Sequence, residues 1–170
     1  MVPDSHIRDR DCAKVAWQKM TTIAARVSTG EIAADSMVCG DDSFYLVEKL
    51  RRGKNSVYGA CGDWDKCLKM LQVLESGGEL DSDIDVTVLE LRSDGKDNGL
   101  WVYEGTIIPA RIKNDFWAIG TGANYAIAAM HLGASPTEAV KIACLYDTSS
   151  HEPVDTMRLG GTRGRSKNTG

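Results

Sequence analysis

The chain has 170 residues, which is enough for one globular domain with a sizeable core. Its net charge of -4 at pH 7 argues against a general nucleic-acid-binding protein, because such proteins carry a basic face. The sequence has no run of about 18 apolar residues, so we expect no membrane-spanning helix and no membrane partner.

The first 20 residues are polar and mix basic with acidic side chains. They lack the continuous apolar stretch of a secretory signal peptide, so we expect a cytoplasmic protein. We interpret 1–20 either as a propeptide or as an upstream extension, and the sequence leaves that choice open.

The pattern of residue types changes at Thr21, where short runs of strand-forming residues begin. The turn at 28–30 separates two expected strands, and a turn at 53–55 separates a second pair. The four expected strands are Thr22–Val27, Glu31–Ala34, Ser43–Arg51 and Ser56–Cys61.

An amphipathic helix is expected next, and an acidic loop at 76–85 follows it. Ser135-Pro136-Thr137-Glu138 has the residue types of a strong helix start. The expected helices are Asp63–Leu74, Asn124–Leu132 and one from Ser135 to about Tyr146. The later strands are expected at Val86–Leu91, Leu100–Glu104, Thr106–Ile112 (interrupted by Pro109), Phe116–Ile119 and Pro153–Leu159.

Hairpin connections dominate this order, and long parallel crossovers are absent from it. The pattern predicts an α+β domain of antiparallel sheets covered by helices over residues 21–159. Residues 160–170 contain almost no apolar side chain and are expected to form a disordered basic tail.

No cofactor or metal site is expected. The five cysteines form no CxxC pair and are interpreted as reduced core residues. The Gly120-Thr121-Gly122 turn before a helix is only a weak signal for phosphate binding, because the rest of a nucleotide motif is missing.

The sequence Met20-Thr21-Thr22 is the most informative local feature. A threonine hydroxyl inside a chain has no adjacent base. At a free amino terminus its own α-amine, with a pKa of about 8, can act as that base. Thr21 can become the first residue if Met20 is an initiator that aminopeptidase removes, or if a propeptide is cleaved after Met20.

Five ordered blocks resemble the N-terminal-nucleophile (Ntn) hydrolases of the proteasome β-subunit and HslV type, and they look closest to small HslV-like proteins of bacteria and phages. The blocks are TTIAARVSTGEIAADSM (21–37), VEKLRR (47–52), YGACGDWD (58–65), WAIGTGANYAIAAM (117–130) and ACLYDTSSHEPVD (143–155). The resemblance implies a four-layer αββα sandwich and a threonine-type peptidase that needs no cofactor.

The resemblance also implies a role for each matched residue. Thr21 would be the nucleophile, Lys49 the cation beside it, and Asp35 the partner that orients Lys49. Gly62 would offer a backbone N–H to the oxyanion, and the residues around the nucleophile's amine would be Thr121, Asp147 and Ser150.

The loop after Asp35 (36–44) is shorter than in that family, so no cleavage preference can be transferred. The resemblance implies that the substrates are unfolded polypeptides or peptides. It also implies assembly into a self-compartmentalised homo-oligomeric ring, and a ring ATPase unfoldase is an expected partner. Two alternatives stay open: a catalytically silent ring-forming subunit that retains 1–20, and an Ntn amidohydrolase acting on a small amide.

Overall fold

The computed structural model describes residues 21–39, 43–80, 84–160 and 164–165. The expected propeptide or extension at 1–20 lies outside the described residues, as does most of the expected tail. The boundaries of those two segments therefore stay predictions.

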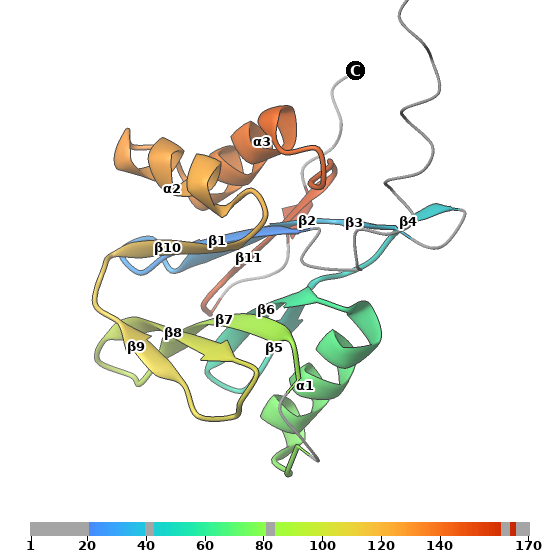
Figure 1. Cartoon of the computed structure of the whole chain (residues 1–170). Helices are drawn as coiled ribbons and strands as arrows, with labels where there is room; N and C mark the ends of the chain where they lie inside the picture. The colour runs from blue at the N-terminus through green and yellow to red at the C-terminus, as the bar shows by residue number, and fades with distance from the viewer. Residues whose placement is uncertain (1–20, 40–42, 81–83, 161–163, 166–170) are drawn as a thin grey trace, which may run out of the picture.

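The described residues form a body of two antiparallel five-stranded sheets and three helices (Figure 1). The first sheet has the order β10-β1-β2-β11-β12, and the second has the order β5-β6-β7-β8-β9. The strands of the first sheet are Phe116–Gly120, Thr22–Arg26, Glu31–Asp35, Val154–Arg158 and Gly164–Arg165. Those of the second are Leu50–Arg52, Ser56–Gly62, Val86–Ser93, Asn98–Glu104 and Ala110–Ile112. The strand Gly164–Arg165 lies in the segment that we expected to be disordered, and it pairs with β11.

The two sheets bury an apolar core between them, formed by side chains such as Ile23, Ile32, Leu89 and Leu100. Helices α2 (Ala123–His131) and α3 (Pro136–Tyr146) cover the other face of the first sheet (Figure 1). That contact is made largely of alanine and valine, whose small side chains let the helices approach the strands closely.

Helix α1 (Trp64–Ser76) covers the outer face of the second sheet through Cys67, Met70 and Leu71. It begins where expected because the Asp63 side chain accepts a hydrogen bond from the Lys66 N–H at 3.2 Å. Helix α3 begins with the expected capping box between Ser135 and Glu138. The predicted α+β sandwich of antiparallel sheets and helices is thus present.

The expectation of one strand over Ser43–Arg51 is wrong. The segment forms β4 (Phe44–Leu46), then a break, then β5 in the second sheet. β4 pairs instead with β3 (Met37–Cys39), a strand placed in what we expected to be a loop, and this hairpin extends away from the sheets (Figure 1). The Val47 N–H bonds to the Ser36 carbonyl at 2.8 Å, which closes the base of the hairpin and starts the break.

The expected strand over Thr106–Ile112 is shorter than predicted and covers only β9, after Pro109. Proline has no N–H to donate to a ladder, so pairing begins after it. Within the described residues no helix is long and apolar enough to cross a bilayer.

Candidate active site

Asp35 and Lys49 form an ion pair in the interior, where β2 ends and β5 is about to begin. The exposed fraction is 0% for Asp35 and 1% for Lys49. Lys49 Nζ lies 3.0 Å from both carboxylate oxygens of Asp35. Removing two charges from water is costly, and this two-oxygen contact offsets part of that cost.

The Asp35 carboxylate also accepts two backbone hydrogen bonds. Thr22 N–H donates to Oδ1 at 2.9 Å and His151 N–H donates to Oδ2 at 3.4 Å. Burial raises the pKa of Asp35 above its ordinary value, while Lys49 and the two N–H donors oppose that rise. Asp35 therefore connects the buried ammonium of Lys49 to the backbone of the residue that follows Thr21.

Thr21 lies at the entry to β1 and is only 4% exposed. Its carbonyl oxygen accepts the Thr121 N–H at 2.9 Å, from the turn between β10 and α2. A Cβ at Gly120 would overlap that same carbonyl oxygen, and Gly120 has a φ of 96°. Glycine at 120 thus permits both the turn and its close approach to Thr21.

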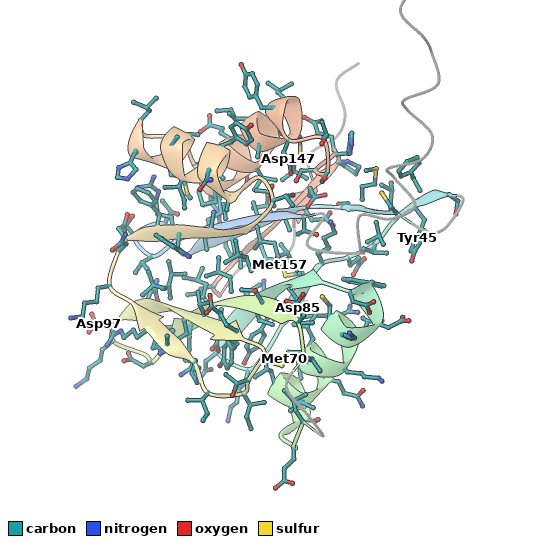
Figure 2. The ribbon with its side chains drawn as sticks, in the orientation of Figure 1. Tyr45, Met70, Asp85, Asp97, Asp147 and Met157 are labelled. Carbon is teal, nitrogen blue, oxygen red and sulfur yellow. The ribbon has the colours of Figure 1, made fainter. Side chains whose placement is uncertain are left out.

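A set of side-chain hydrogen bonds lies next to this turn. Asp147 Oδ2 accepts from Thr121 Oγ1 at 2.7 Å and from Ser150 Oγ at 2.5 Å. Because the Ser150 hydroxyl proton goes to Asp147, Ser150 Oγ in turn accepts a hydrogen bond from Thr22 Oγ1 at 2.7 Å. Figure 2 shows Asp147 at the end of α3, on the side of the first sheet that the helices cover. The structure therefore brings together the three residues predicted to surround the nucleophile's amine.

Thr22 and Gly122 belong to this arrangement and were missed in the sequence. Thr22 bonds to Asp35 through its backbone and to Ser150 through its side chain. A Cβ at Gly122 would overlap Thr22 Oγ1, so glycine there leaves room for that hydroxyl. The doubled threonine and the Gly-Thr-Gly turn were the available signals, although neither reveals that the two segments meet.

Gly62 ends β6 with a φ of 139°, and a Cβ there would lie 2.7 Å from the Asp85 carbonyl oxygen. Gly62 and Thr21 line the same cavity, which has a volume of about 190 Å³. The cavity is also bounded by the β3–β4 hairpin, where Figure 2 labels Tyr45, and by the start of α1. Thr21, which precedes β1 of the first sheet, and Gly62, in β6 of the second sheet, thus line one cavity.

Six of the seven predicted site residues are joined by these hydrogen bonds and Gly62 lines the cavity beside Thr21, but the catalytic roles of all seven stay predictions. The geometry offers a threonine that lines a cavity, a buried lysine and a carboxylate that accepts two hydroxyl protons. No group of three or more His, Cys, Asp or Glu side chains that could hold a metal occurs among the described residues.

Sequence comparisons find no relative: no protein-family model matches the chain, and no curated protein does. Comparison of structures does find similar proteins. One is Thiobacillus denitrificans BPH in complex with epoxomicin, with a TM-score of 0.59 and 19% sequence identity. The match covers 82% of this chain and 98% of that one. The two chains share a fold.

Proposed function

We propose that this protein is a threonine-type peptidase that uses Thr21 as an amino-terminal nucleophile once residues 1–20 are absent. One observation carries the proposal. The Thr21-Thr22 backbone is held between the Lys49–Asp35 ion pair and the Thr121–Asp147–Ser150 hydrogen-bond set, at a cavity that Gly62 also lines.

The proposed reaction proceeds in two halves. Thr21 Oγ attacks the scissile carbonyl carbon, and its proton passes through the α-amine to the leaving amine as the C–N bond breaks. Water then adds to the resulting ester, which releases the carboxylic acid and restores the Thr21 hydroxyl. The α-amine exists only when the Met20–Thr21 peptide bond is gone, so the chain with residues 1–20 attached would be inactive.

Lys49 would lower the pKa of the nearby amine and hydroxyl through its positive charge, and Asp35 would hold Lys49 in place. The backbone N–H of Gly62 would donate to the oxyanion that forms during attack. Asp147, with Thr121 and Ser150, would orient the α-amine.

The same proposal assigns the sandwich to the four-layer αββα Ntn-hydrolase class. The shared fold with a bacterial protein complexed with epoxomicin, a proteasome inhibitor, supports it. The proposal has five further parts: a self-compartmentalised, HslV-like homo-oligomeric ring, autoprocessing after Met20, peptide or unfolded protein substrates, a ring ATPase unfoldase and a cytoplasmic location.

The test is the intact mass of the full chain after expression, measured together with cleavage of fluorogenic peptides. Loss of residues 1–20 in the parent but not in Thr21→Ala, accompanied by cleavage, would support the proposal. A chain that starts at Met20 provides the second arm, because aminopeptidase alone can then expose Thr21. If neither chain cuts any peptide, the peptidase fails and the silent ring subunit is favoured.

A further inference from the structure

The cavity beside Thr21 has apolar walls from three elements. Val38 and Tyr45 come from the β3–β4 hairpin, Ala60 comes from β6, and Trp64 is the first residue of α1. The volume of about 190 Å³ equals that of roughly six water molecules, which is room for one long side chain. An apolar wall of this kind suits a side chain with a long hydrocarbon stem.

Two carboxylates complete the lining at the start of α1. Asp63 is half-buried and Asp65 is exposed. Within the described residues, the bond that caps the helix is accepted by Oδ1 of Asp63. Within the described part of the chain, no lysine, arginine or histidine lines this cavity. The two acids therefore give the cavity a negative character.

The start of a helix carries a partial positive charge, which would by itself favour an anion. Here Asp63 occupies the cap position and Asp65 lies in the first turn. Two full negative charges outweigh a partial charge of about one half.

We propose that, given the peptidase activity proposed above, this cavity binds a lysine or arginine side chain of the substrate on the acyl side of the cut bond. The aliphatic stem packs against the apolar walls, and the cation lies near the Trp64 and Tyr45 rings. Its charge is then paired with Asp63 and Asp65. Aspartate or glutamate at this substrate position is repelled by the same two carboxylates.

The experiment compares kcat/KM for fluorogenic peptides that differ only in the residue before the cut: Arg, Lys, Leu or Glu. The protein is the full chain after loss of residues 1–20. We expect Arg and Lys to exceed Glu by roughly tenfold or more, and to exceed Leu by a few-fold. Equal rates for Arg and Glu, or a preference for Glu, would overturn this inference while leaving the peptidase intact. Cleavage of no peptide would overturn the peptidase itself and this inference with it.

Charge-removing variants separate the role of charge from effects on folding. Asp63→Asn keeps a side chain that caps a helix about as well as aspartate, and Asp65→Asn removes the second charge. The doubly substituted protein should lower the Arg-to-Glu ratio of kcat/KM by roughly five- to tenfold, and Asp65→Lys should lower it further. Asp97→Asn, at the exposed turn between β7 and β8, is the matched control and should leave the ratio unchanged. An unchanged ratio in the doubly substituted protein would overturn the assignment.

Discussion

Thr22 Oγ1 lies 2.7 Å from Ser150 Oγ, although the two residues are 128 positions apart in the chain. The backbone N–H of the same Thr22 donates to Asp35. One residue thus contacts both the ion pair and the hydroxyl set that flank Thr21. We infer that Thr22 is a positioning residue for Thr21, the proposed nucleophile that precedes it.

Thr22→Val removes the hydroxyl and keeps the shape of the side chain. Since Ser150 would lose a partner, we expect kcat to fall by about tenfold with little change in KM, and the free energy of unfolding to fall by about 1 kcal/mol. Steady-state kinetics and denaturant unfolding check both values. Thr22→Ser keeps the hydroxyl and should recover most of kcat, whereas an equal loss in both variants would indicate a packing role alone.

Lys49→Ala should abolish turnover, because it removes the cation proposed to act on the amine of Thr21. It also leaves Asp35 buried without this partner, which should cost about 3–5 kcal/mol of folding stability. Unfolding by denaturant measures that loss, and light scattering measures the assembled mass.

The matched control is Asp35→Asn combined with Lys49→Met, which removes both charges and should recover part of the stability without recovering activity. Loss of the assembly in a still folded Lys49→Ala protein would point to a structural role for Lys49. Retained turnover would remove Lys49 from the mechanism.

Gly122→Ala should destabilise the protein by about 1–3 kcal/mol, because its Cβ would overlap Thr22 Oγ1 and would lie 3.0 Å from the Ala143 Cβ. Thermal unfolding is the measurement. Gly78→Ala is the control, since the atoms nearest to a Cβ there are 3.9 Å away. Equal melting temperatures for the two variants would contradict the close approach of the β10–α2 turn to Thr22.

The thiols of Cys67 and Cys144 should resist alkylation in the folded protein at pH 8. Burial is the main cause that raises the pKa of each to about 12, so very little reactive thiolate exists at that pH. Peptide mapping after iodoacetamide treatment should find both unmodified, and both modified in guanidinium. Rapid labelling of either thiol in the native state would contradict its burial.

Local patterns in the sequence predicted most of the fold. The capping box at Ser135 and the 3.6-residue period of α1 are interactions within one segment, so they are visible in the sequence. The break between β4 and β5 is not visible in the sequence. Lys49 lies in this break, where it pairs with Asp35 from another strand. A tertiary ion pair overrides the local preference for one continuous strand.

The candidate site, too, could be predicted only in part from the sequence. Its residues were found through their resemblance to a family, and the structure then brought Thr121, Asp147 and Ser150 into contact. Thr22 was missed because its side-chain partner lies in a distant segment. The acids beside the cavity were missed as well. An aspartate at the start of an expected helix is an ordinary cap, so Asp63 gave no sign of lining a cavity.

The central claim is that Thr21, at a free amino terminus, is the reactive nucleophile. The most direct test is the mass of the protein after exposure to epoxomicin, followed by mapping of the modified peptide. We predict addition of one inhibitor molecule to the tryptic peptide that begins at Thr21 and ends at Arg26, and no addition to Thr21→Ala. An unmodified protein, or an adduct on another residue such as Cys39, would contradict the account.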